Sequence, residues 1–243
     1  VTTGLNNTLI GSLSGDALTS GNSNVAVGKD ALGGDTTGGG SVAVGKDSLK
    51  VQNNTTSTTM YNVAVGIEAG AAVTTGVQNT LIGALAGDAL TDSDYNVAVG
   101  VSALSGDTKG NTAVAVGAAA LFNQNFTTST NNYNTGIGFN AGYSITTGVQ
   151  NTLLGGLAGD SLTDADNNVA VGRSALEADT LGSTSVAIGY AALATQNFTT
   201  ATNTYNVAIG FQAGNDITTG VENTLLGGLA GDAITTGNYN ICI

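Results

Sequence analysis

The sequence predicts an all-β solenoid, a parallel β-roll of about thirteen coils that runs through the whole chain of 243 residues. Three observations predict it. A glycine recurs with a 17/17/17/21 periodicity, a short apolar run precedes nearly every one of these glycines, and proline is absent. Self-similarity at a short fixed period is typical of proteins in which each repeat packs only on its neighbours. The recurring glycines are Gly11, Gly28, Gly45, Gly66, Gly83, Gly100, Gly117, Gly138, Gly155, Gly172, Gly189, Gly210 and Gly227.

Each coil is expected to begin with one short strand. If Asn24 is position 1 of its coil, Val25-Ala26-Val27 fill positions 2 to 4 and the recurring glycine is position 5. Runs of this kind that end in glycine are typical of strands. Position 3 is also mostly apolar, although side chains alternate between the two faces of a strand. We therefore expect burial on both faces, one inside the coil and one against a neighbouring chain, which predicts an oligomer.

The rest of the coil is expected to fill the interior and to turn. Position 8 is alanine or serine in every coil, so we expect positions 3 and 8 to require a partner surface. Leucine at position 9 accompanies aspartate at position 12, as in Leu32 and Asp35, whereas glycine at position 9 accompanies an aliphatic residue, as in Gly87 and Leu90. This exchange keeps the core volume constant. Thr-Thr-Gly and Thr-Asp segments close the coils as turns.

Composition narrows the classes of function. The net charge is −12, and the five Lys and Arg residues are scattered, so no surface for nucleic acid is expected. No apolar run reaches the roughly 18 residues that a membrane span requires. Histidine is absent and Cys242 is the single cysteine. We therefore expect no disulfide, no cofactor and no enzymatic activity.

The two ends of the sequence match the inside of a coil. Residues 1–4 resemble the close of a coil such as residues 73–76, and residues 240–243 resemble the start of a strand without its glycine. Residues 1–243 are accordingly predicted to form a single repeat solenoid domain. We expect it to be a fragment of a longer fibrous protein, with partial coils at 1–6 and 240–243.

The units Asn-Val-Ala-Val-Gly-x-x-Ala-Leu and Asn-Thr-Leu-Ile-Gly-x-x-Ala-Gly resemble the head repeats of trimeric autotransporter adhesins, the YadA-like heads. They resemble even more the variant repeats of phage tail fibres and of bacterial tail-fibre-like surface proteins. The resemblance covers essentially the whole chain and implies a left-handed parallel β-roll, a homotrimer and an extracellular place on a cell or virion. Both the short and the long coils of this chain exceed the typical head unit in length. No binding residue carries over, because ligand contacts vary among these proteins.

These observations predict a fibrous attachment protein, an adhesin head or a tail-fibre shaft. It would present a rigid, repetitive surface to a host-surface glycan or receptor. The alternative is a purely structural spacer, or a subunit of a homopolymeric extracellular filament, with no ligand site.

The long coils carry the candidate ligand contacts, because they extend one corner of the solenoid once in every cycle of four coils. An exposed phenylalanine among Asn and Thr would suit a glycan or a receptor, whereas a ring that folds back would plug the corner. The first residue of each candidate pair also begins an Asn-x-Thr glycan-acceptor motif. The candidates are Asn53, Asn54, Asn125, Phe126, Asn197 and Phe198.

Two other surface chemistries have less support. The clusters Asp88-x-x-x-Asp92-x-Asp94 and Asp160-x-x-x-Asp164-x-Asp166 offer hard oxygen ligands for Ca²⁺, but a ladder of turn caps explains them better. No metal site is therefore predicted. A row of threonines can suit ice, but Asp, Gly and Ser interrupt the row here.

Overall fold

The computed structural model describes residues 1–56 and 58–243. All regular secondary structure in these ranges is β-strand. The strands stack in parallel as the coils of a β-solenoid, as the repeats predict. The coils form two compact units, residues 1–118 with 125–131, and residues 119–124 with 132–243. That they form a single continuous domain stays a prediction.

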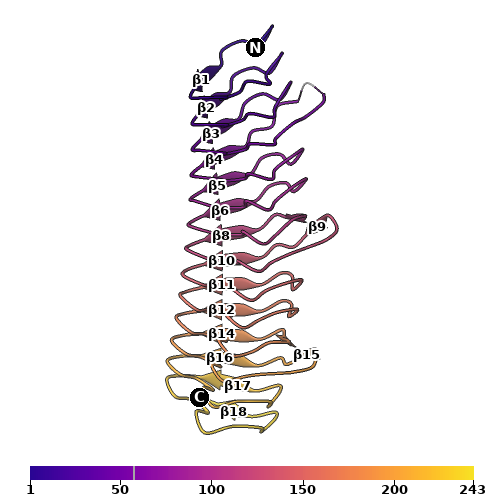
Figure 1. Ribbon diagram of the computed structural model, residues 1–243. Helices are drawn as coiled ribbons and strands as arrows, with labels where there is room; N and C mark the ends of the chain where they lie inside the picture. The colour runs from indigo at the N-terminus through magenta and orange to yellow at the C-terminus, as the bar shows by residue number, and fades with distance from the viewer. Residues whose placement is uncertain (57) are drawn as a thin grey trace. The chain divides into compact units, whose positions relative to one another are not determined.

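In the first unit, consecutive coils pair strand on strand, with Val25 opposite Val42 and Val42 opposite Val63 (Figure 1). A second, short pair lies at the corner of the coils, β7 (Gly110–Asn111) with β9 (Thr130–Asn131). The coil strands are β1 (Thr8–Ile10), β2 (Val25–Val27), β3 (Val42–Val44), β4 (Val63–Val65), β5 (Thr80–Ile82), β6 (Val97–Val99) and β8 (Val114–Val116).

The second unit repeats this arrangement. Val169 lies opposite Val186 and Val186 opposite Val207, and the short pair is β13 (Gly182–Ser183) with β15 (Thr202–Asn203). The coil strands are β10 (Thr135–Ile137), β11 (Thr152–Leu154), β12 (Val169–Val171), β14 (Val186–Ile188), β16 (Val207–Ile209), β17 (Thr224–Leu226) and β18 (Ile241–Cys242).

The interior of the coils is made of positions 3 and 8. Ala26 and Leu81 at position 3, and Ala31 and Ala86 at position 8, are fully buried within the single chain. The prediction that these two positions require a partner surface was therefore wrong. A coil this short is narrow, so its interior takes one side chain from each strand, alanine in most coils and leucine in others.

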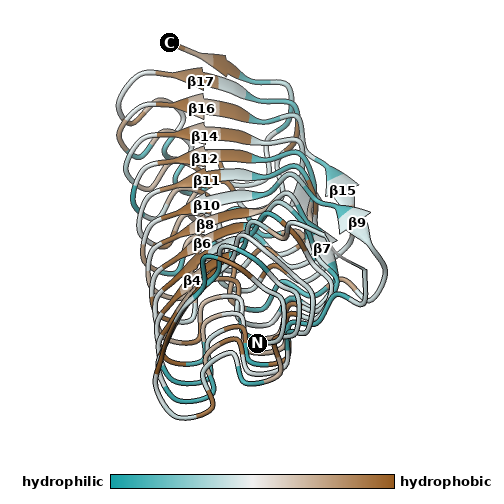
Figure 2. Cartoon of the chain, turned by 90° about the horizontal axis from the view of Figure 1, so that it is seen from above, coloured by the Kyte–Doolittle hydropathy of each residue, from teal (hydrophilic) through white to brown (hydrophobic). Residues whose placement is uncertain are grey.

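Positions 2 and 4 face outward instead. Val97 and Val99 are half-buried on either side of the buried Ala98, and the same pattern holds for most coil strands. Figure 2 shows the coil strands mostly in brown, the colour of hydrophobic residues. The solenoid therefore carries an apolar outer face along its strands, made of different residues from those we expected.

The recurring glycine has a backbone conformation that other residues rarely adopt. Its φ lies between 128° and 143° in all thirteen coils. A Cβ on Gly28 would lie 2.5 Å from the carbonyl oxygen of Gly45 in the next coil. Both facts explain why position 5 is invariant along this chain.

The exchange between positions 9 and 12 is confirmed. Leu32 at position 9 and Leu90 at position 12 are both fully buried. A Cβ on Gly87, at position 9, would lie 2.8 Å from Cδ1 of Leu90, so the two alternatives fill one space.

A buried asparagine ladder joins the coils at position 1. Asn24 Oδ1 accepts the N–H of Ser41 at 2.9 Å, and its Nδ2 donates to the carbonyl oxygen of Gly38 at 2.9 Å. Asn168 makes the equivalent bonds to Ser185 and Gly182 in the second unit. These side chains satisfy backbone groups that the coil buries at the entrance to each strand.

Candidate functional site

The corners built by the long coils carry short polar strands in each unit. Figure 2 shows β9 of the first unit and β15 of the second in teal and white, against the brown of the coil strands. Each of these strands pairs with a strand of the preceding short coil. The extra residues are therefore held by backbone hydrogen bonds as part of the solenoid.

The phenylalanines of these corners are buried. Phe126 is 5% exposed and Phe198 is 7% exposed. The backbone N–H of each is held by a buried carboxylate, Oδ1 of Asp107 at 3.1 Å and Oδ1 of Asp179 at 3.0 Å. The hypothesis of exposed aromatic tips was wrong, because the rings fold back and plug the corner, as the alternative proposed.

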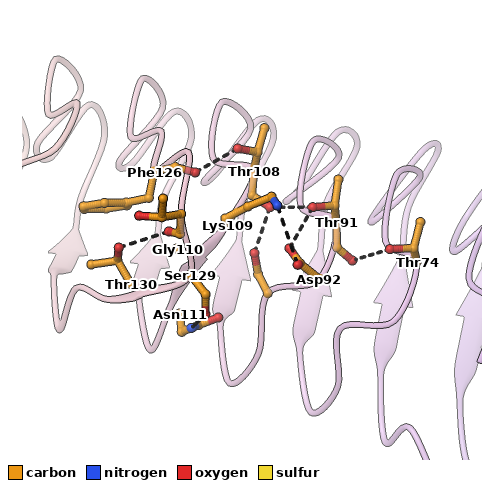
Figure 3. Close-up of polar contacts among 12 residues, drawn as sticks. Thr74, Thr91, Asp92, Thr108, Lys109, Gly110, Asn111, Phe126, Ser129 and Thr130 are labelled. Carbon is orange, nitrogen blue, oxygen red and sulfur yellow. Dashed lines mark hydrogen bonds and ion pairs between the residues drawn. The ribbon is translucent and has the colours of Figure 1, made fainter.

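The candidate asparagines that precede the rings belong to a ladder of threonines. The hydroxyl of Thr74 donates to the carbonyl oxygen of Thr91 at 3.1 Å, and Thr91 donates to Thr108 at 3.0 Å (Figure 3). The Thr108 hydroxyl oxygen lies 2.9 Å from both the carbonyl oxygen of Phe126 and Oδ1 of Asn125, and these two acceptors share its one proton.

The other two candidate asparagines have the same role. Asn53 Oδ1 accepts from Thr36 at 2.8 Å, and Asn197 Oδ1 accepts from Thr180 at 3.1 Å. Asn125 and Asn197 are exposed and Asn53 is half-buried. One side of each amide therefore holds the corner together, and modification at the Asn-x-Thr motifs stays a prediction.

Asn54 replaces the aromatic plug in the first long coil. Its Oδ1 accepts from the N–H of Thr56 at 3.2 Å and from the hydroxyl of Thr56 at 3.0 Å, which closes a local turn. Its Nδ2 lies 3.4 Å from Sδ of the fully buried Met60. Asn54 therefore also serves the packing of the corner.

A buried polar network supports each corner. Gln52 is fully buried, its Nε2 donates to Oδ2 of Asp35 at 2.7 Å, and its Oε1 accepts from Nδ2 of Asn62 at 2.8 Å. In the second unit Gln196 joins Asp179 at 2.5 Å and Asn206 at 2.8 Å. We did not predict buried carboxylates here, although aspartate at position 12 always precedes a coil with glutamine at position 12.

The acidic clusters are turn caps in the structure. Asp94 accepts the N–H of Val77 at 2.8 Å, and Asp166 accepts that of Val149 at 2.7 Å. In the described part of the chain, no group of three or more His, Cys, Asp or Glu side chains is placed to hold a metal ion.

Asp160 differs from its equivalent one cycle earlier. Asp88 receives a hydrogen bond from the Ser105 hydroxyl at 2.5 Å, whereas the residue in the place of Ser105 is Glu177. Oδ1 of Asp160 is buried and has no hydrogen-bond partner among the described residues. Burial, and to a lesser extent the charge of Glu177, raise the pKa of the Asp160 carboxyl above its ordinary value.

Two depressions open beside the first long coil. One, of about 340 Å³, is lined by Asn53 together with Lys50, Asp16 and Asp30. The other, of about 320 Å³, is lined by uncharged residues that include Tyr61. Of the predicted contact residues, Asn53 lines the first of these depressions, as the described part of the chain shows.

No protein-family model, no curated protein and no solved structure matches this chain. Within the described residues, no helix is long and apolar enough to cross a membrane.

Proposed function

We propose that this chain is a fibrous attachment protein of a cell or virion surface, built like an adhesin head or a tail-fibre shaft. The observation that carries the proposal is that inner and outer positions of each coil have separate roles. Positions 1, 3, 8, 9 and 12 pack inside the coil or form the hydrogen bonds between coils, as Asn24, Ala26 and Leu32 illustrate. Outer positions are free of these roles and vary: Lys29, Val101 and Arg173 occupy one exposed position in the three cycles, where a rigid scaffold can present them to a partner.

A homotrimer is part of this proposal. In each unit, the outer strand face carries an unbroken row of valine, isoleucine and leucine at position 4 beside a row of mostly valine and threonine at position 2, and Ile10 and Ile82 are more than one third exposed. Single soluble chains rarely present continuous apolar rows of this kind. Three copies that pack these rows together would bury them and repeat every surface feature around one axis, which supports avidity.

The alternative is a structural spacer or a filament subunit with no ligand. One observation favours it: the corner residues that suggested a ligand are occupied by internal contacts, with both phenylalanines buried. Under this alternative the long coils only brace the solenoid at regular intervals.

The experiment that separates the two is a direct attachment assay. Fluorescently labelled protein would be applied to cultured epithelial cells, bacterial cells and a glycan array, with heat-unfolded protein as the control. Saturable retention of the folded protein on one of these surfaces supports attachment. Uniform background on all of them, from a protein that is folded and oligomeric, favours the structural alternative.

A further inference from the structure

The uncharged depression of the first unit has the size and the lining of a small-ligand site. Its volume is about 320 Å³, and ligand pockets start at about 300 Å³. The residues that line it include Gly39, Gly40, Asn22, Thr59 and Tyr61. None of the described residues that line it carries a charge.

The depression exists because two side chains are missing. One cycle of four coils later, Asn111 and Thr112 take the places of Gly39 and Gly40, and the third cycle has Ser183 and Thr184 there. In those cycles the corner strands β7 and β13 pair with β9 and β15. In the first cycle the described residues of this corner form one isolated bridge, between Gly39 and Thr59.

A backbone donor faces the space that the missing side chains leave. In the second cycle the N–H of Asp94 donates to Oδ1 of Asn111 at 2.8 Å, and in the third the N–H of Asp166 donates to Oγ of Ser183 at 2.9 Å. The equivalent N–H, that of Asn22, makes no hydrogen bond within the described residues. A side-chain oxygen therefore accepts this N–H in the second and third cycles, and the first cycle has no such oxygen among its described residues.

The walls supply further polar groups and one aromatic ring. Oδ1 of Asn22 accepts the N–H of Leu5 at 2.7 Å, which leaves its Nδ2 free to donate among the described residues. Thr59 adds a hydroxyl, and the ring of Tyr61 is 59% exposed on a backbone fixed at φ 53°. The side chain is therefore largely uncovered.

We propose that this depression binds a neutral pyranose, such as the terminal sugar of a surface glycan. The ring of Tyr61 would pack against the C–H face of the sugar, and a sugar hydroxyl oxygen would accept the orphaned N–H of Asn22. The lining offers no counter-charge to a carboxylate, a phosphate or an amine, which disfavours ionic ligands. This inference rests on the proposed attachment function and names a ligand class and a site for it.

The test is saturation-transfer NMR on the intact protein with the methyl glycosides of glucose, galactose, mannose and N-acetylglucosamine. Sodium glucuronate and leucinamide serve as charged probes of similar size. We expect saturation transfer to at least one neutral glycoside and none to the charged probes. A protein that transfers saturation to none of the four glycosides at millimolar concentration overturns the proposal.

The residues at the equivalent corner of the second cycle define a variant that should close the depression. Gly39→Asn, Gly40→Thr and Thr59→Asn together install the residues of the second cycle, where Thr112 has a φ of 63° against 73° for Gly40. A Cβ on Gly39 would lie 2.8 Å from the carbonyl oxygen of Asn22, so the backbone of the first cycle must shift slightly to accept the change. We expect the triple variant to fold with a somewhat lower melting temperature and to lose the saturation signal. A folded triple variant that binds as well as the parent contradicts the site.

A second pair of variants tests the ring. Tyr61→Ala should weaken glycoside binding about tenfold, the order of an aromatic packing contact. Tyr205→Ala, at the same position of the third cycle and 56% exposed, should leave it unchanged. Equal loss in both variants would assign the binding elsewhere. If the protein binds none of the glycosides but still attaches to cells, the proposed sugar site is wrong and the proposed attachment function is retained.

Discussion

The amide of Gln52 donates to the carboxylate of Asp35 across 2.7 Å, and neither side chain has any exposed surface. The other oxygen of Asp35 accepts the N–H of Gly38 at 2.9 Å. A buried carboxylate is tolerated when hydrogen bonds replace the water that it loses. This relationship makes the corner of the long coil a rigid part of the solenoid.

Asp35→Ala is therefore expected to destabilise the first unit strongly. The change leaves the N–H of Gly38 without its acceptor and removes one partner of Gln52, at a cost of about 3 kcal/mol. Urea denaturation followed by circular dichroism measures it. Asp92→Ala is the control, because Asp92 is exposed and its ion pair with Lys109 spans 3.8 Å, so we expect a change within about 0.5 kcal/mol. Equal midpoints for the two variants would contradict the buried network.

The recurring glycine gives a second prediction. Gly117 has a φ of 130°, a conformation that a β-branched residue avoids, so Gly117→Val should cost about 2 kcal/mol or more. Lys109→Ala removes a surface charge that is 41% exposed, and it should change stability little. Thermal melting of both variants compares the two losses of stability. Similar melting temperatures would contradict the special role of the glycine at position 5.

Much of the fold could be predicted from the sequence, because the pattern repeats. The strand at Val25–Val27, the glycine that ends it and the exchange between Leu32 and Leu90 all follow from the spacing of residue types, and the structure confirms them. Every coil repeats the same choice of residue types at the same positions. A preference at one position, such as glycine at position 5, can therefore be told from chance variation in a single coil.

The inward face of the strand could not be predicted by the same means. Val97, Ala98 and Val99 are all apolar, so alternation gives no contrast between the two faces. The deciding quantity is the width of the coil, which accepts alanine or leucine in one row but not two rows of valine. The burial of Asp35 was missed because aspartate is read as a turn residue, and only its pairing with a glutamine one coil later signals a network.

The corner phenylalanines give a third prediction. Phe126→Ala together with Phe198→Ala should lower stability by about 3 kcal/mol at each site, because both rings fill the corner rather than face solvent. Differential scanning calorimetry measures the loss. Attachment to cells, assayed well below the lowered melting temperature, should equal that of the parent. Weakened attachment by a folded double variant would restore these rings as ligand contacts.

The raised pKa of Asp160 gives a prediction about pH. A carboxyl whose pKa is higher in the folded protein than in the unfolded chain favours folding when it is protonated. This contribution is fully present below the unfolded pKa and is lost as the pH rises through the folded pKa. At neutral pH the charged, partly buried Asp160 therefore opposes folding.

Glu177→Ser tests this relationship with a residue that the chain itself supplies, since serine donates to Asp88 in the equivalent place. We expect the variant to lower the pKa of Asp160, as followed by carboxyl ¹³C NMR, and to stabilise the protein at pH 7 by about 1 kcal/mol. The gain should shrink in acid, where the carboxyl is protonated in both proteins. A gain of the same size at pH 7 and in acid would show that the charge of Asp160 has no part in it.

The outer strand face gives the last prediction, which concerns assembly. Val99 and Ala98 are neighbours on β6, but the first is half-buried on the outside and the second is fully buried inside the coil. Val99→Lys should leave the solenoid folded and convert the proposed trimer into monomers, because a charge in the packed rows of three chains has no partner. Ala98→Lys should unfold the coils around it, since the ammonium group would lie in the interior. Analytical ultracentrifugation and circular dichroism on both variants separate the two effects.

A parent protein that sediments as a monomer at micromolar concentration rules out the trimer. If the parent is a trimer and the Val99→Lys protein is also a trimer, its subunits associate through a face other than the strands.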